Sequence, residues 1–158
     1  MRSCGIGKDI ASLSFLVQFA VHRSKGKCSV THLAGCCLLV VEDEALIALM
    51  TATMLRDLGC TVLGVAHTLA DGMAMTEANL HCLDAATLDI NLGGESAVPL
   101  AALLEANGIP FIVTTGYDDA QFLAAFEGMP VLHKPFLAED LAQALMHLLP
   151  EPKGQSPH

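Results

Sequence analysis

Residues 37–66 read CLLVVEDEALIALMTATMLRDLGCTVLGVA, and this stretch predicts one strand–helix–strand unit. The run Cys37–Val41 is entirely apolar and ends at acidic residues, as expected for a parallel strand buried on both faces. Ala45–Leu58 follows with helical apolar spacing, and Gly59 ends it. The apolar positions are Leu46, Leu49, Met50, Met54 and Leu58. Thr61–Ala66 is a second apolar strand, so a helix connects two strands that we expect to be parallel.

The same alternation of strands and helices continues to residue 149. We expect strands at Ala85–Ile90, Phe111–Thr115 and Pro130–His133. We expect helices at Leu69–Leu80, Ser96–Ala106, Asp118–Phe126 and Leu137–Leu149. Gly93-Gly94 marks a loop, and Pro99 falls in the first turn of its helix, where proline is tolerated. This order of elements predicts an α/β fold with a doubly wound, five-stranded parallel sheet.

The chain divides into three parts: a leader of uncertain structure (1–36), one domain (37–150) and a flexible tail (151–158). In the leader, Ile10–Val21 is apolar but too short to span a bilayer. A lipoprotein-like box stands at 33–36, but the polar residues 22–32 separate it from the apolar run, which argues against a signal peptide. The sequence leaves open an additional helix, a loose tail or a misplaced start codon.

Composition excludes several classes of protein. An apolar fraction of 53% argues against disorder. Residues 1–37 carry five basic residues against one acidic residue, whereas the rest carries three basic residues against sixteen acidic ones. Such an acidic domain is a poor binder of nucleic acid. The six cysteines form no CxxC pair, so we expect reduced thiols in a cytoplasmic protein.

Polar residues follow the predicted strands at the edge of the sheet where ligand sites form. They are Glu42-Asp43-Glu44, Asp89, Thr115-Gly116 and Lys134. Each has an ordinary structural interpretation, since acidic residues cap helices, threonine favours strands and a lysine before proline usually lies in solvent. Their joint occurrence at consecutive strand ends instead favours a functional site.

These residue types fit the chemistry of phosphoryl transfer. Clustered carboxylates repel one another and need a cation, and oxygen ligands suit Mg²⁺. A carboxylate such as Asp89 can attack phosphorus and form an acyl phosphate. Lys134 would then pair with one phosphoryl oxygen and Thr115 would hydrogen-bond another, stabilising charge and position.

Four segments, LLVVEDE, TLDINLGGES, FIVTTGYDD and VLHKPF, occur in this order. On these motifs, residues 38–149 resemble a response-regulator receiver domain of two-component systems, which has a flavodoxin-like (βα)5 fold. The resemblance implies that Asp89 is the phosphoacceptor and Asp43 a direct Mg²⁺ ligand. It further implies that Glu42 holds the metal through water and that Asn91 supplies a backbone carbonyl.

The resemblance also assigns roles at the ends of the later strands. It implies that Thr115 is the switch hydroxyl, that Lys134 contacts the phosphoryl group, and that the Lys134-Pro135 bond is cis. Many receivers place an aromatic residue three positions before the lysine, but here Val131 stands there. Tyr117 would then either gate access to the acyl phosphate or cover the edge of the sheet.

A finer resemblance is to stand-alone receivers of the FATGUY type, which have a Phe-Ala-Thr-Gly-Tyr-like fourth strand. The corresponding segment here is Val113-Thr114-Thr115-Gly116-Tyr117, with Val113 and Thr114 as departures. This subgroup implies a histidine kinase of the HWE or related type as partner. We expect a downstream protein to bind residues 118–149.

Three functions would each use an aspartate at a strand end or its surroundings. The first is a single-domain response regulator that accepts a phosphoryl group from phosphohistidine onto Asp89 with Mg²⁺ and signals through protein contacts or onward phosphotransfer, without being an enzyme in the usual sense. The second is a pseudo-receiver that only binds proteins, against which the intact residue set argues. The third, a haloacid-dehalogenase-like phosphatase, needs a DxDx[TV] pattern on the first strand, which Glu42-Asp43-Glu44-Ala45 does not match.

Overall fold

The computed structural model describes residues 33–149. Its centre is a five-stranded sheet in the order β2-β1-β3-β6-β7, with every neighbouring pair parallel. The strands are β1 Cys37–Val41, β2 Thr61–Ala66, β3 Ala85–Asp89, β6 Phe111–Thr115 and β7 Val131–His133. The predicted fold class is therefore confirmed, and each strand lies within one residue of its expected bounds.

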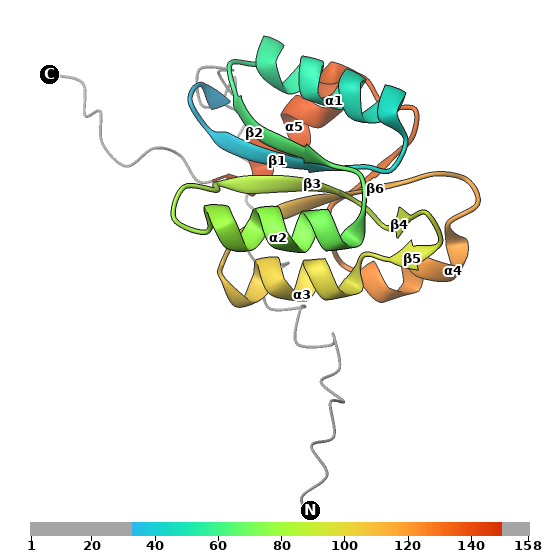
Figure 1. Ribbon diagram of the computed structural model, residues 1–158. Helices are drawn as coiled ribbons and strands as arrows, with labels where there is room; N and C mark the ends of the chain where they lie inside the picture. Colours follow the sequence, from blue (N-terminus) through green and yellow to red (C-terminus); the bar gives the residue numbers. More distant parts are fainter. Residues whose placement is uncertain (1–32, 150–158) are drawn as a thin grey trace, which may run out of the picture.

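Helices cover both faces of this sheet (Figure 1). One face carries α1 Ala45–Asp57 and α5 Ala138–Leu148, and the other carries α2 Leu69–Asn79 and α3 Val98–Ala106. The segment after β6 forms only a four-residue helix, α4 Ala120–Leu123, followed by a 3-10 turn, η4 Ala124–Phe126. The expected helix over Asp118–Phe126 is thus shorter and less regular than predicted.

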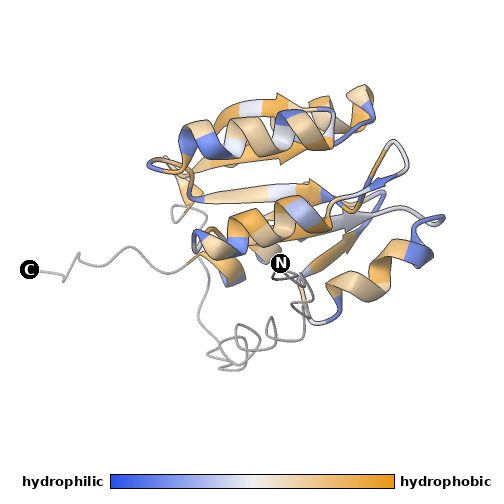
Figure 2. Cartoon of the chain, turned by 60° about the horizontal axis from the view of Figure 1, so that its bottom comes forward, coloured by the Kyte–Doolittle hydropathy of each residue, from blue (hydrophilic) through white to orange (hydrophobic). Residues whose placement is uncertain are grey.

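The apolar side chains of the strands form two separate hydrophobic cores, one on each face of the sheet. On β1, Leu38 and Val40 pack with the α1–α5 side, while Leu39 and Val41 pack with the α2–α3 side. Successive side chains of a strand point to opposite faces, so a strand covered on both faces must be apolar throughout. Figure 2 shows mainly apolar colours along the strands and mixed colours along the helices.

Helix α1 packs on the sheet mainly through small residues rather than through the large apolar side chains of its first turns. Its buried residues are Ala48, Thr51, Ala52 and Leu55. Leu46, Leu49 and Met50 are instead exposed, at 69%, 60% and 48%. The helix is apolar on more than one face, and the small side chains at 48 and 52 allow close packing on the sheet. The apolar spacing thus correctly predicted the helix.

The predicted Gly93-Gly94 loop is the turn of a small antiparallel ribbon between β4 Asn91–Leu92 and β5 Glu95–Ser96. Both glycines have positive φ, 64° and 93°, a conformation that other residues adopt only with strain. Ser96 belongs to this ribbon, so α3 begins at Val98 rather than at the predicted Ser96. Pro99 lies in the first turn of α3, as expected.

The described residues begin inside the predicted leader. Leu33 is fully buried in the core on the α1–α5 side, and the Gly35 N–H donates to the Gly59 carbonyl at 2.9 Å. Leu33 and Gly35 therefore contact the folded body, and the boundary at residue 37 stays a prediction. The expectations for the rest of the leader and for the tail 151–158 lie outside the described residues. Within residues 33–149, no helix has the length and apolarity needed to cross a membrane.

Candidate functional site

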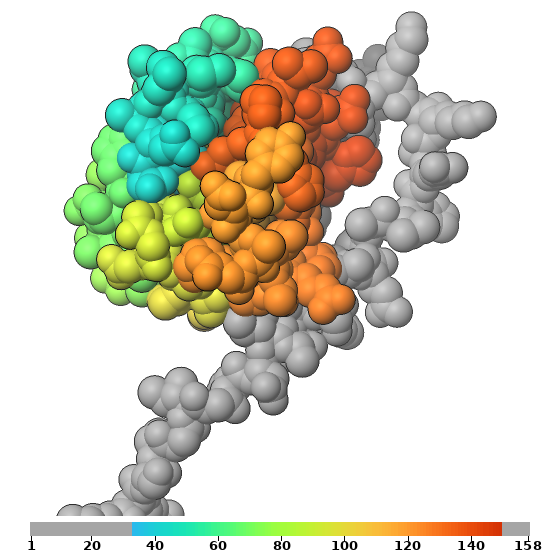
Figure 3. Space-filling view, turned by 90° about the vertical axis from the view of Figure 1, so that its right-hand side faces the viewer, coloured from blue at the N-terminus to red at the C-terminus, as the bar shows by residue number. Residues whose placement is uncertain are grey.

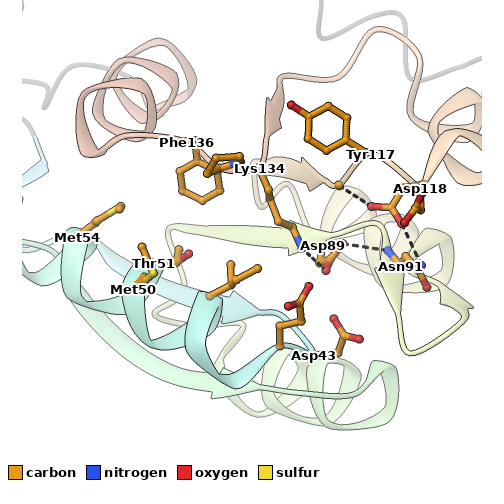
Figure 4. Close-up of a pocket in the computed structure, with 15 residues that line it drawn as sticks. Asp43, Met50, Thr51, Met54, Asp89, Asn91, Tyr117, Asp118, Lys134 and Phe136 are labelled. Carbon is orange, nitrogen blue, oxygen red and sulfur yellow. Dashed lines mark hydrogen bonds and ion pairs between the residues drawn. The ribbon is translucent and has the colours of Figure 1, made fainter.

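The strand-end residues come together at the carboxyl edge of the sheet, as the topology requires. Figure 3 looks onto this edge, where the segments that follow β1, β3, β6 and β7 meet. A pocket of about 530 Å³ opens there, and its lining includes Asp43, Asp89, Asn91, Tyr117 and Lys134 (Figure 4). The strands that carry them lie side by side because β1, β3, β6 and β7 are consecutive in the sheet.

Lys134 joins two buried carboxylates at the base of this site. Its Nζ lies 2.7 Å from Asp89 Oδ2 and 2.9 Å from Glu42 Oε2. Glu42 and Asp89 are only 3% and 2% exposed, and the lysine side chain is 10% exposed. The interpretation of this lysine as a solvated loop residue is therefore wrong. We call Glu42, Asp89 and Lys134 the carboxylate–lysine cluster.

Burial changes the acid–base behaviour of this cluster. Loss of water raises the pKa of Glu42 to about 8, and the nearby Asp89 adds to the rise while Lys134 opposes it. Burial also raises the pKa of Asp89, against the hydrogen bonds from Lys134 and from the Asn91 N–H. Burial lowers the pKa of Lys134, but Asp89 and Glu42 raise it by more, so the pKa lies above its ordinary value. The Glu42 and Asp89 carboxyls therefore ionise less readily than exposed carboxyls do.

Asp43 completes an acidic group that can hold a metal ion. Three carboxylate oxygens lie within 4.8 Å of one another, one each from Glu42, Asp43 and Asp89. The set is entirely oxygen, which fits Mg²⁺ rather than a softer metal. Asp43 is exposed, and its Oδ2 accepts from the Gly93 N–H at 3.0 Å, which positions it against the β4–β5 ribbon. A metal carbonyl ligand at Asn91 stays a prediction.

These acidic residues do not serve as caps of α1. Glu44 stands at the N-cap position but makes no side-chain capping hydrogen bond. Glu42 Oε1 accepts from the Glu44 N–H at 3.1 Å, and Asp43 turns to the β4–β5 ribbon. The ordinary structural interpretation of this run is thus wrong, and the carboxylates of Glu42 and Asp43 are directed toward the site.

Thr115 and Tyr117 are placed differently from the carboxylates. The Thr115 side chain is buried, and its hydroxyl lies 3.2 Å from the Gly116 carbonyl and 3.3 Å from Asp119 Oδ2. Tyr117 is 93% exposed at the rim of the pocket, so its ring does not cover the edge of the sheet. A gating role for Tyr117 stays a prediction. The Lys134-Pro135 bond is cis, as the resemblance implied.

Asp119 is a residue of the site that the sequence reasoning missed. It is only 7% exposed and accepts hydrogen bonds from the Gly116 N–H at 2.6 Å and from Asn91 Nδ2 at 3.0 Å. The sequence placed it in the first turn of the helix expected over Asp118–Phe126. An acidic residue three positions after a loop N–H is the spacing of a side chain that bonds back to that N–H, and this signal was present.

Comparison with known proteins agrees with this geometry. The family described as the Response regulator receiver domain matches residues 38–146. The transcriptional regulatory protein PdtaR of Mycobacterium tuberculosis is 31% identical over 113 residues, which are 68% of this chain and 54% of that protein. The chain thus spans about half the length of this curated relative.

Solved structures show the same likeness. SdrG from Sphingomonas melonis Fr1 is 40% identical with a TM-score of 0.65, and the match covers 73% of this chain and 96% of that one. The response regulator PhyR from Brucella abortus is 26% identical with a TM-score of 0.64, and the match covers 76% of this chain and 50% of that one.

Proposed function

The chain belongs to the response regulator receiver domain family of two-component signalling, and we propose that it accepts a phosphoryl group from a histidine kinase onto Asp89. The observation that carries the proposal is the position of Asp89 at the end of β3. There its carboxylate is bonded to Lys134 at 2.7 Å and lies beside Glu42 and Asp43. A receiver domain is a phosphoacceptor signalling module rather than a classical enzyme.

The proposed step moves one phosphoryl group between two side chains. A carboxylate oxygen of Asp89 attacks phosphorus, the bond from phosphorus to the kinase histidine nitrogen breaks, and that nitrogen keeps the electron pair and takes up a proton. Mg²⁺ held by Glu42, Asp43 and Asp89 would supply the positive charge that lets two anions approach. Lys134, already bonded to Asp89, stabilises the transferred oxygens through its ammonium group.

We further propose a stand-alone receiver of the FATGUY type over residues 37–150. The likeness to SdrG, of which this chain covers nearly the whole length, supports this assignment. The segment from Val113 to Tyr117 supports it as well, although Val113 and Thr114 depart from the usual residues. The proposed partners are a histidine kinase of the HWE or related type and a downstream protein that binds α4, β7 and α5 (residues 118–149). A cytoplasmic location stays a prediction.

Incubation of the purified chain with Mg²⁺ and acetyl phosphate tests the phosphoacceptor function. We expect the intact mass to rise by one phosphoryl group and the gain to disappear in Asp89→Asn. Asp84→Asn is the matched control, because Asp84 is an exposed aspartate that precedes β3 at its opposite end. A wild-type chain that gains no mass, under conditions that phosphorylate another receiver, would support the pseudo-receiver instead.

A further inference from the structure

Asp119 joins the loops after β3 and β6 through one carboxylate. Its Oδ2 accepts from the Gly116 N–H at 2.6 Å and lies 3.3 Å from the Thr115 hydroxyl, and its Oδ1 accepts from Asn91 Nδ2 at 3.0 Å. We call Asn91, Thr115, Gly116 and Asp119 the Asp119 cluster. The donors in this cluster come from two strand ends that border the phosphoacceptor, since β3 and β6 are neighbours.

The groups that Asp119 occupies are those that an anion on Asp89 would need. The hydroxyl of Thr115 and the N–H of Gly116 are adjacent donors at the carboxyl end of β6. Asn91 contacts the phosphoacceptor directly, because its backbone N–H donates to Asp89 Oδ1 at 3.1 Å (Figure 4). A carboxylate and a phosphoryl group are both oxygen anions that attract such donors. In the resting protein the Asp119 carboxylate therefore accepts from donors that an anion on Asp89 would also attract.

Asp119 also stands where its carboxylate can cap helix α4, but it makes no capping hydrogen bond in this structure. Asp119 stands at the N-cap position of α4, and the N–H groups of Phe122 and Leu123 reach its backbone carbonyl. Aspartate is among the best N-cap residues because its side chain accepts from the first free N–H groups of a helix. Here no side-chain cap forms, and α4 ends after four residues. The carboxylate is thus used in the cluster instead of in the helix.

We infer that Asp119 is a positioning residue that keeps the Thr115 hydroxyl and the Gly116 N–H bonded to its own carboxylate until a phosphoryl group on Asp89 competes for these donors. The inference rests on the proposed phosphorylation of Asp89. When the Thr115 hydroxyl and the Gly116 N–H donate to the phosphoryl group instead, the Asp119 carboxylate is released and can cap α4. The segment 116–126 then has two arrangements, and the anion at Asp89 shifts the population between them. This route needs no aromatic residue at Val131.

Binding of beryllofluoride, a phosphoryl mimic that attaches to carboxylates, tests the inference in the full chain with Mg²⁺. In Asp119→Asn the side chain keeps only one acceptor oxygen and no charge, so it competes less for the donors. We expect the mimic to bind about tenfold more tightly than to the wild type, the effect of losing roughly one charge-assisted hydrogen bond. Asp118→Asn is the matched control, because it removes the same charge from the exposed neighbour.

Gly116→Ala perturbs the cluster without changing its charge. An added Cβ would lie 3.3 Å from Asp119 Oδ2, so the carboxylate must shift, while Gly116 itself has no positive φ that would disfavour alanine. We expect tighter binding of the mimic here too, by about two- to threefold. Amide NMR signals of Gln121 and Phe122, the second and third residues of α4, report the new cap. In the wild type they should move when beryllofluoride binds, and in Asp119→Asn they should move much less.

The outcomes separate this inference from the proposed function. If the wild type binds no beryllofluoride, the phosphoacceptor function fails and the inference fails with it. If the wild type binds and both Asp119→Asn and Gly116→Ala bind equally well or more weakly, the phosphoacceptor function stands and the role of Asp119 is refuted. A purely structural residue would lower the melting temperature of the variant without tightening its binding of the mimic, and that result also refutes the role.

Discussion

The carboxylate–lysine cluster and the Asp119 cluster lie at the same edge of one sheet, but they differ in whether their donors already contact the phosphoacceptor. In the first, Lys134 already contacts the phosphoacceptor at 2.7 Å. In the second, the Thr115 hydroxyl bonds within its own loop and with Asp119. The difference indicates a division between accepting the phosphoryl group and responding to it. The rigid strand ends hold the groups that accept the phosphoryl group, and the loop after β6 holds groups that must rearrange to respond to it.

Loss of the cation from the first cluster is the most severe test of this division. In Lys134→Ala, the two buried carboxylates of Glu42 and Asp89 lose their ion pairs with the lysine, and the transferred oxygens lose their ammonium group. We expect the rate of phosphorylation by acetyl phosphate to fall about a hundredfold, as for other lost groups that stabilise transferred charge. Intact mass spectrometry over time measures this rate. Arg56→Ala removes an equal charge from an exposed position of α1 and should change the rate less than twofold.

The acid–base state of the first cluster makes Mg²⁺ binding depend on pH. Mg²⁺ needs ionised carboxylates, whereas the folded protein keeps Glu42 protonated up to a pKa of about 8. Affinity for Mg²⁺ should therefore rise with pH, by at most about tenfold per unit, and level off above pH 8. Titrations followed by NMR between pH 6 and 9 would reveal this slope. An affinity that is constant over this range would contradict the raised pKa.

The same raised pKa fixes the sign of a stability effect. Between the ordinary pKa of 4.5 and about 8, the folded chain binds a proton at Glu42 that the unfolded chain has released. Without Mg²⁺, this group therefore makes the free energy of unfolding decline as pH rises through that window. Urea unfolding at several pH values measures the slope, and Glu42→Gln, which stays neutral, should flatten it.

The sequence predicted the first cluster well because strand ends locate it. Each member follows an apolar strand by one residue or ends it, and the parallel order then forces Glu42, Asp89 and Lys134 together. It could not predict which face of α1 is buried, because Leu46, Leu49 and Met50 compete with small residues whose packing depends on the sheet. It also missed Asp119, since the role of that residue comes from a loop conformation that apolar spacing does not encode.

A change at Thr115 sharpens the comparison, because it should affect response more than acceptance. Thr115→Val removes the hydroxyl but not the Gly116 N–H, so we expect the phosphorylation rate to fall only a few-fold. The NMR shifts that phosphorylation produces in residues 116–126 should be strongly reduced. Thr114→Val is a suitable control, since Thr114 is equally buried on β6 and takes no part in the Asp119 cluster. A hundredfold loss of rate in Thr115→Val would place Thr115 among the accepting groups and break the division.

Substitution of Tyr117 should have the smallest effect on the rate at which Asp89 is phosphorylated. Its ring is 93% exposed at the rim of the pocket, so Tyr117→Ala removes almost no buried area and should alter the phosphorylation rate less than twofold. Once Asp89 is phosphorylated, the ring can move over the pocket and shield the acyl phosphate from water. In that case the alanine variant loses its phosphoryl group several-fold faster than the wild type, as measured by the decay of the added mass. Equal decay rates would mean that the exposed ring has no gating role, and the response of the loop after β6 would then depend on Thr115, Gly116 and Asp119.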